Sequence, residues 1–385
     1  MSKTIGGTFL VLGTSVGAGI LSLPLITAAC GFGTAILLIT LSWSVMYYTG
    51  LQLLEACSKY PVGVNFTTLI DKKISRRMQV IFTICYCLLL YSLLAAYTTQ
   101  GADTISLVLH NDVHSVSINA LVFLIIFGAI ITGYQLSDYA NRTFLLIKFL
   151  FFIISIFIML KFFTARYLLN ATPTFSAVLL AWPTLLPAFG FQNIIPVLYE
   201  YQNGNKNAVK KSITYGSILV LGIYIFWIFA CFSILPQRGI HSYESIYKHG
   251  NNLLQFISAI KNKTGGHWVK YNLQIFINIS IITSFICCGL SLLHYIKDIF
   301  QRIKIKISNT IGVVTSLLPP YFFSILYPNG FILALQYASI FAVIVFVYTP
   351  MLLCNKKLFS TKNLYPLILG TLVIIAQVLN LLPAA

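Results

Sequence analysis

The sequence predicts an all-α membrane protein with about eleven transmembrane helices. Its 385 residues are 58% hydrophobic and only 9% charged, whereas a soluble domain usually carries about 25% charged residues. Apolar runs recur from end to end, and each is long enough to cross about 30 Å of hydrocarbon as a helix. Turn and charge signals such as "LSDYANR", "YQNGNKN" and "YPNG" separate these runs.

We place the spans at 5–28, 33–57, 79–109, 117–136, 143–164, 176–200, 212–236, 271–296, 308–327, 330–353 and 364–383. A cleavable signal peptide is not expected, because more membrane segments follow the first one. Lysine and arginine concentrate in the segments on the side of the N-terminus. This bias predicts a cytoplasmic N-terminus and, after eleven spans, a C-terminus on the outer side.

The net charge of +17 raises the possibility of a nucleic-acid partner. The basic residues, however, lie in short loops between the spans, which is the topological bias of a membrane protein. We therefore expect the lipid bilayer as a partner and no nucleic acid.

The long loop at 237–270 has a helical pattern of its own. Leu253, Leu254, Ile257 and Ile260 fall on one face of a helix. We expect a short amphipathic helix on the outer face, serving as a lid or simply packing on the protein.

The spans show a weak internal repeat in a single transmembrane domain that covers residues 1–385. The first and sixth spans contain glycine and proline, the third and eighth are unusually long, and each pair is five spans apart. A five-plus-five inverted repeat explains this pattern, with repeat one at about 5–164, repeat two at about 176–353 and an extra helix at 364–383. In such transporters, broken helices of the two halves form the binding site near the membrane midplane.

The first span contains Gly13, Gly17 and Gly19, and each lowers helix propensity by about 1 kcal/mol relative to alanine. Unwinding at Gly17, Ala18 and Gly19 would free amides that suit a carboxylate and carbonyls that suit an ammonium or a cation. Gly13-x-x-x-Gly17 is also a helix-packing motif, so this span alone leaves both interpretations open.

The sixth span favours a broken helix. In "WPTLLPAFGFQNIIPVLYEY", Pro183, Pro187 and Pro196 remove three backbone donors. Phe189, Gly190, Phe191 and Gln192 lie between these prolines and suit a pocket for a flat ring with a polar tip. A kinked packing helix with core aromatic residues is the alternative.

Several polar side chains inside the spans are candidates for the site. Lys148, in the fifth span, is a candidate for proton coupling, because ionisable residues inside the membrane are costly; snorkelling to the cytoplasmic side is the alternative. Glu55 and His294 are gating candidates, with a solvated cap and an interfacial histidine as their respective alternatives. Further pocket-lining candidates are Tyr97, Ser284 and Ser291, although serine is also common in helix packing.

Enzymatic chemistry is not expected. The eight cysteines form no CxxC pair, and we interpret them as small buried hydrophobic residues. No cluster of His, Asp or Cys suggests a catalytic or metal site, so we expect no catalytic residue, no metal and no cofactor.

Motifs along the whole chain resemble the bacterial aromatic amino acid permeases, a tyrosine- and tryptophan-specific family of the amino acid–polyamine–organocation superfamily. They are "GTSVGAGILSLP", "YYTGLQLLEA", "AAYTTQGA", "NRTFLLIK", "FGFQNIIPVLYEY", "TSFICCGLSLLHYIKDIFQR" and "LPPYFFSILYPNGF". The pattern is most similar to the tyrosine permeases of this family.

The resemblance implies an eleven-helix five-plus-five transporter and proton-driven uptake of an aromatic amino acid, preferably tyrosine, across the bacterial inner membrane, with a periplasmic C-terminus. Tryptophan specificity or sodium coupling is the alternative. The resemblance also implies that the substrate backbone lies at residues 17–19 and against residues 189–191, and Lys148 matches the family's fifth-helix lysine. His294 departs from the tyrosine permeases, which usually carry an acid there, so a proton role at this position is not supported.

Overall fold

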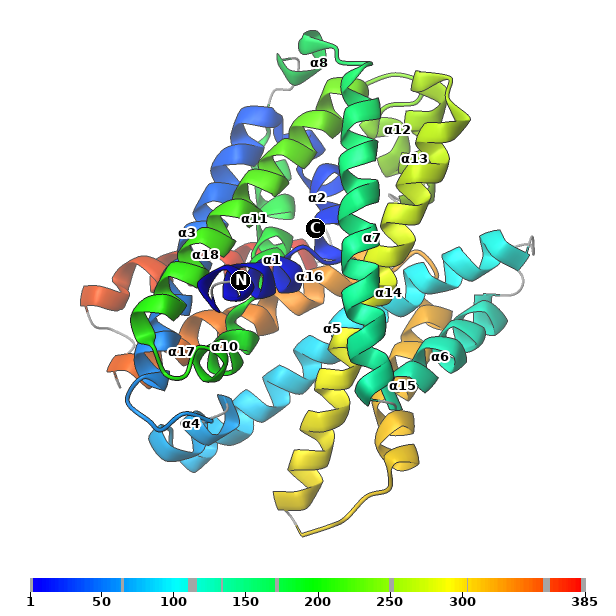
Figure 1. Ribbon diagram of the computed structural model, residues 1–385. Helices are drawn as coiled ribbons and strands as arrows, with labels where there is room; N and C mark the ends of the chain where they lie inside the picture. The colour runs from blue at the N-terminus through cyan, green and yellow to red at the C-terminus, as the bar shows by residue number, and fades with distance from the viewer. Residues whose placement is uncertain are drawn as a thin grey trace. The chain divides into compact units, whose positions relative to one another are not determined.

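The computed structural model describes residues 3–63, 66–109, 116–132, 134–169, 173–248, 253–302, 304–355 and 361–381. All regular structure in these ranges is helical (Figure 1). The main helices are α1 (Lys3–Ser15), α2 (Gly19–Thr27), α3 (Phe32–Cys57), α5 (Arg76–Leu109), α6 (Val116–Thr132), α7 (Tyr134–Leu160), α9 (Phe175–Leu185), α10 (Ile195–Tyr201), α11 (Lys206–Ile234), α14 (His267–Arg302), α15 (Asn309–Leu326), α16 (Phe331–Ala342), α17 (Thr349–Asn355) and α18 (Leu364–Leu381). Short helices are α4 (Phe66–Lys73), α8 (Ala165–Leu169), α12 (Tyr243–Lys248) and α13 (Leu253–Thr264).

The helices account for the predicted spans. Among the described residues, 9 helices are long and apolar enough to cross a membrane, and α1 and α2 form one more span bent by 55°. The remaining predicted span is α6, a shorter apolar helix. As expected, the third and eighth spans are long: α5 has 34 residues and α14 has 36.

Two features of the helices differ from the prediction. The turn expected at "LSDYANR" is wrong, because α7 already begins at Tyr134 and this polar stretch of the sequence is part of the helix. The tenth span is not one regular α-helix, since a π-helical segment, Val343–Tyr348, separates α16 from α17.

The chain forms two compact units. The first consists of residues 1–86, 171–229 and 339–385, and the second of residues 87–170 and 230–338. The first unit therefore contains both predicted broken helices, and the second contains most of α5, together with α6, α7, α14 and α15. These units do not correspond to the proposed repeats at 5–164 and 176–353, and the repeat boundaries stay a prediction.

In the first unit, α11 packs along α1. The Ser212 hydroxyl donates to the Thr4 carbonyl at 2.9 Å. One turn further along α11, the backbones come so close that a Cβ on Gly216 would lie 2.6 Å from the Val11 Cβ. This contact requires glycine at position 216 and fixes α1 against α11 at Val11.

The C-terminal helix belongs to the same unit. The Asn380 side-chain amide donates to the Leu179 carbonyl of α9 at 2.8 Å. Near the other end, the Gln52 amide of α3 donates to the Asn363 side-chain oxygen at 2.8 Å. These polar contacts hold α9, α3 and α18 together inside an otherwise apolar bundle.

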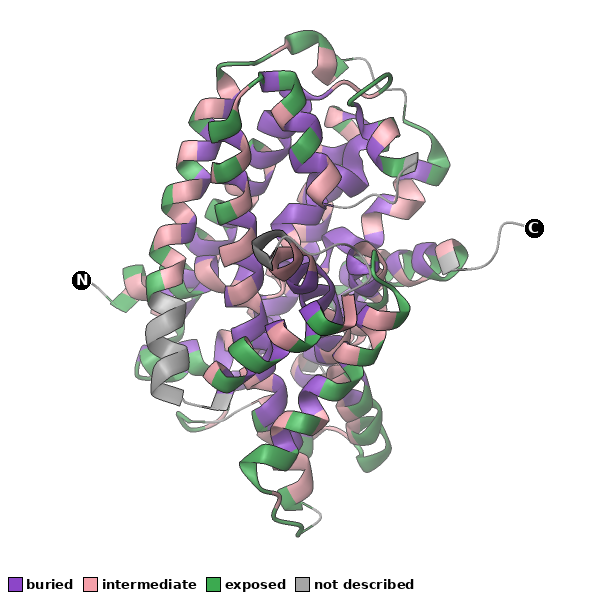
Figure 2. Cartoon of the chain, turned by 90° about the vertical axis from the view of Figure 1, so that its right-hand side faces the viewer, coloured by how far each residue is buried: buried purple, intermediate pink, exposed green. Residues whose placement is uncertain are grey.

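In the second unit, α7 has one buried face and one exposed apolar face. Lys148, Phe152, Ser155 and Met159 are buried, at a spacing that places them on one side of the helix. The opposite side exposes a series of large apolar side chains that begins at Leu146, which is 74% exposed, as expected where a helix faces lipid. Exposed outer faces recur along many helices (Figure 2).

The predicted loop helix is confirmed as α13. Leu253, Ile257 and Ile260 are buried, whereas Leu254 is only half-buried. The Tyr243 ring of α12 packs between Phe232, at 5.3 Å, and Phe256, at 6.3 Å between ring centroids. Burial raises the pKa of the Tyr243 phenol well above its usual range.

Candidate substrate site at the broken helices

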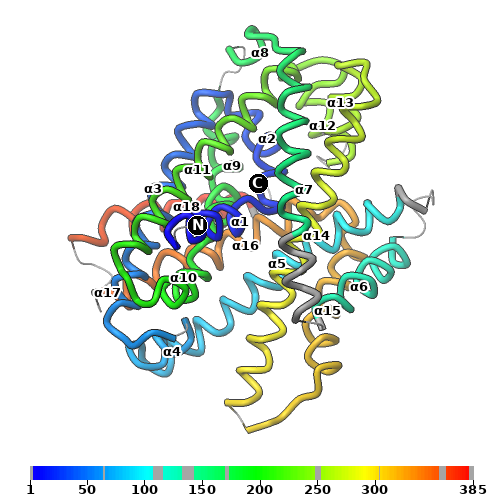
Figure 3. Tube along the Cα trace, in the orientation of Figure 1, coloured from blue at the N-terminus to red at the C-terminus, as the bar shows by residue number. Residues whose placement is uncertain are grey.

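The first span is interrupted at residues 16–18, which we call the first break. The Val16 amide makes the last α-helical bond to Leu12, at 2.9 Å, and the Gly17 amide turns back to the Ser15 carbonyl at 2.8 Å. In a continuous helix, that carbonyl would accept from Gly19, four residues on. Gly19 is the first residue of α2, where amides have no acceptor within the helix. The Gly17 amide, by contrast, is used in the turn and is not free as predicted. The change of direction is visible in the chain trace (Figure 3).

The sixth span is interrupted at residues 186–194, which we call the second break. Short 3₁₀ turns at Pro187–Phe189 and Gln192–Ile194 flank Gly190 and Phe191. Pro187 and Pro196 sit at the first turns of their helices, where the missing amide costs little. Pro183 lies within α9, so the break follows it rather than occurring at it.

The two breaks lie against each other. A Cβ built on Gly19 would lie 3.5 Å from the Cα of Ala188. Gly190 is more tightly confined, because its Cβ would lie 3.0 Å from the Pro187 carbonyl and 3.3 Å from the Phe346 ring. The prediction that the first and sixth spans are broken, and that their breaks meet, agrees with this geometry.

Tyr224 of α11 touches both breaks. Its hydroxyl lies 2.6 Å from the Ser15 carbonyl and 2.7 Å from the Ala188 carbonyl. The side chain is fully buried, and its ring lies 5.0 Å from the Phe189 ring. Sequence reasoning missed this residue because its partners are 209 and 36 residues away in the chain. The available signal was a tyrosine in the middle of a span.

Phe189 and Phe191 are fully buried in the first unit. Phe189 packs on Tyr224, and the Phe191 ring lies where a Cβ on Gly50 of α3 would come within 2.8 Å of it. The two rings therefore support the second break from inside the unit.

Gln192 also connects elements of the first unit. Its amide donates to the Met46 carbonyl at 3.1 Å and to the Thr49 hydroxyl at 3.4 Å. The side-chain oxygen is buried and has no hydrogen-bond partner in the described part of the chain. Gln192 thus ties the second break to α3 and retains one unused acceptor.

Lys148 lies in the second unit, deep in α7. It is only 1% exposed, and its ammonium lies 5.9 Å from the Phe149 ring centroid. Burial on the face of α7 opposite to Leu146 argues against snorkelling, because a snorkelling lysine exposes its charged end.

The remaining candidates of the second unit differ in burial. Tyr97 is buried, Ser284 is half-buried and His294 is exposed. The Ser291 hydroxyl donates to the Cys287 carbonyl of its own helix at 2.8 Å. Their roles in lining a pocket or in gating stay predictions.

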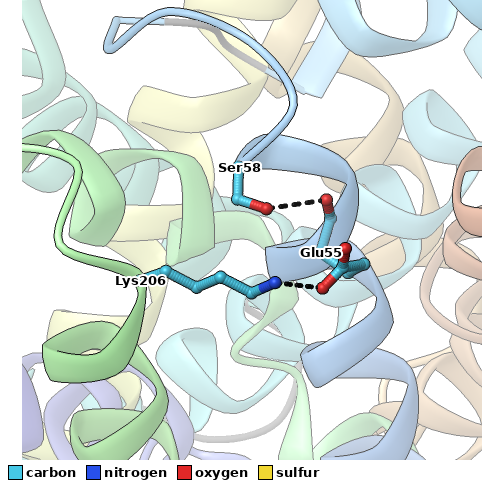
Figure 4. A network of polar contacts seen from close by, with 3 residues as sticks. All are labelled: Glu55, Ser58 and Lys206. Carbon is cyan, nitrogen blue, oxygen red and sulfur yellow. Dashed lines mark hydrogen bonds and ion pairs between the residues drawn. The ribbon is translucent and has the colours of Figure 1, made fainter.

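Glu55 forms an ion pair with Lys206 at the ends of α3 and α11 (Figure 4). The Ser58 hydroxyl donates to the Glu55 carbonyl at 3.0 Å and caps the same helix end. Both charged side chains are about half exposed, at 40% and 46%, and both belong to the first unit. The geometry shows a surface ion pair between two packed helices, and a gating role for Glu55 stays a prediction.

Within the described residues, no group of three or more His, Cys, Asp or Glu side chains is placed to hold a metal ion.

Comparison with known proteins extends over the whole chain. Residues 1–383 match the model of the tryptophan/tyrosine permease family. The tyrosine-specific transport system 1 of Haemophilus influenzae is 32% identical, over 94% of this chain and 90% of the relative. The low affinity tryptophan permease of Escherichia coli K12 is 29% identical, over 91% of this chain and 86% of the relative.

A solved structure shows the same fold at much lower identity. A transporter of the nucleobase-cation-symport-1 family, in a closed conformation with bromovinylhydantoin bound, matches with a TM-score of 0.64 and 14% identity. The match covers 98% of this chain and 90% of that one. The broken first and sixth spans thus belong to an established transporter fold, and the sequence match over the whole chain shows that this multi-pass membrane protein is a member of the tryptophan/tyrosine permease family.

Proposed function

We propose that the protein carries an aromatic amino acid, with tyrosine preferred, into the cell across the bacterial inner membrane together with a proton. We place the N-terminus in the cytoplasm and the C-terminus in the periplasm. The family match and the name of the Haemophilus relative, a tyrosine-specific transport system, support the substrate class.

The observation that carries the proposal is the pair of adjacent breaks in α1–α2 and α9–α10. An amino acid has a carboxylate and an ammonium on one carbon, so its site needs donors and acceptors within a few ångströms of each other. The Gly19 amide, which lacks its helical acceptor, lies at the positive end of α2, where a carboxylate is stabilised. Backbone carbonyls of the two breaks suit the ammonium.

We propose that Gly17, Ala18 and Gly19 bind the charged end of the substrate together with the backbone around Gly190. Burial of Phe189 and Phe191 supports a role behind the second break. Direct contact of these rings, or of Tyr97, with the ring of the substrate stays a prediction.

Lys148 is our candidate for proton coupling. A buried ammonium is costly in a membrane, and losing a proton removes that cost. The position of the Lys148 ammonium on the buried face of α7 supports a role that depends on protonation, or one in which the ammonium takes the place of a bound cation.

Uptake into proteoliposomes tests substrate and coupling separately. Labelled tyrosine should accumulate under an inward proton gradient without sodium, and unlabelled tyrosine should compete better than any other amino acid. Uptake that requires sodium and ignores pH would exclude proton coupling, and an absence of tyrosine uptake under every gradient would exclude the proposed substrate.

Tryptophan is the second candidate substrate, because the Escherichia coli relative is named a tryptophan permease. The same competition experiment decides between them: stronger competition by tryptophan than by tyrosine would establish the alternative.

A further inference from the structure

Tyr224 takes the place of hydrogen-bond donors that both breaks have lost. In continuous helices, the Ser15 carbonyl would accept from the Gly19 amide and the Ala188 carbonyl from the Gln192 amide. Instead, the Ser15 carbonyl accepts from the Gly17 amide at 2.8 Å, and the Tyr224 hydroxyl lies 2.6 Å from this carbonyl and 2.7 Å from the Ala188 carbonyl. A phenol has one proton to donate, so the two carbonyls share it.

The position of this hydroxyl is fixed by packing. Tyr224 is fully buried, its ring contacts Phe189, and the close approach at Gly216 holds α11 against α1 two turns earlier. Removing the hydroxyl alone would keep the ring in place and take this donor from both buried carbonyls, which is unfavourable. The Ser15 carbonyl would keep the Gly17 amide as a donor, so the larger loss falls on the Ala188 carbonyl.

We infer that Tyr224 is a positioning residue that holds the two breaks together and keeps both in their unwound shape. The inference rests on the proposed function, because it assigns to Tyr224 the preorganisation of the proposed substrate site. Tyr224 acts through the backbone rather than by touching the substrate.

Preorganisation predicts an effect on affinity. Tyr224→Phe should raise the dissociation constant for tyrosine about 10-fold, which corresponds to about 1.4 kcal/mol, with a wild-type amount of protein in the membrane. Hydrogen exchange of the substrate-free variant should be faster at residues 16–20 and 186–194 and unchanged in α18.

Tyr47→Phe is the matched control. The Tyr47 hydroxyl pairs with the Thr214 hydroxyl at 3.0 Å, so this variant also removes a phenol that links α11 to another helix of the first unit, but one whose hydroxyl bonds to neither break. It should keep the wild-type dissociation constant and the wild-type exchange at both breaks.

The outcomes separate this inference from the proposed function. Unchanged affinity and exchange in Tyr224→Phe would overturn the inference, and so would equal effects of Tyr47→Phe. A Tyr224→Phe protein that fails to accumulate would also overturn it, because the hydroxyl would then serve folding rather than the site. If the wild-type protein binds no aromatic amino acid, the proposed function fails, and the exchange measurement still decides whether Tyr224 holds the breaks.

Discussion

Gly19 offers the sharpest test of the geometry of the breaks, through two substitutions that differ by two methyl groups. A Cβ at this position would lie 3.5 Å from the Ala188 Cα and 3.6 Å from the Ala188 Cβ. These are ordinary carbon–carbon contacts, so Gly19→Ala fits without displacing the second break. Valine adds methyl groups about 1.5 Å further out, and a methyl group directed at Ala188 would overlap its backbone.

The cost of this overlap is about 1–3 kcal/mol, the usual penalty for inserting methyl groups into a packed interior. Valine has little freedom to avoid the contact, because its side-chain rotamer is restricted in a helix. If the penalty acts on the binding-competent shape of the breaks, Gly19→Val should weaken tyrosine binding by about 5- to 150-fold. Gly19→Ala should stay close to wild type.

Binding of labelled tyrosine to purified protein and uptake into proteoliposomes should be measured for both variants, with the amount in the membrane determined separately. Gly222→Val is a matched control in the same unit, because no described atom beyond the neighbouring backbone of its own helix lies within 4 Å of a Cβ at Gly222. It should bind tyrosine like the wild type. Equal losses in Gly19→Ala and Gly19→Val, or equal retention in both, would refute the argument from contact distances.

Two further predictions concern the second unit. Lys148→Met should abolish accumulation against a gradient while tyrosine exchange between equal concentrations persists, because the buried ammonium is assigned to coupling; wild-type accumulation would refute that role. Tyr243→Phe should keep or raise the melting temperature, because the buried phenol has no hydrogen-bond partner among the described residues. Removing an unsatisfied hydroxyl can stabilise a protein by about 1 kcal/mol. A clear loss of stability in a thermal scan would contradict this prediction and indicate a hydrogen-bond partner for the Tyr243 hydroxyl.

Features that depend on local composition could be predicted from the sequence. Apolar runs located the spans, and glycine and proline located both breaks, because these residues weaken helices wherever they occur. The loop helix α13 followed from its apolar spacing. The predicted start of α7 is wrong because polar residues that signal a turn can also continue a helix beyond the apolar run.

Contacts between distant segments could not be predicted. Nothing in the sequence near Tyr224 points to Ser15, and the confinement of Gly19 by Ala188 depends on how two breaks meet in space. The burial of Phe189 and Phe191 shows the same limit: composition indicated aromatic residues at the second break, but only packing shows that both rings lie inside the first unit.

Hydrogen exchange of the wild-type protein with and without tyrosine tests the central claim most directly, namely that the two breaks form the substrate site. Tyrosine should slow exchange at residues 16–20 and 186–194 together, with half-maximal protection at the concentration that half-saturates binding, and should leave α13 and α18 unchanged. Protection of neither break at saturating tyrosine, or protection confined to other helices, would contradict the account.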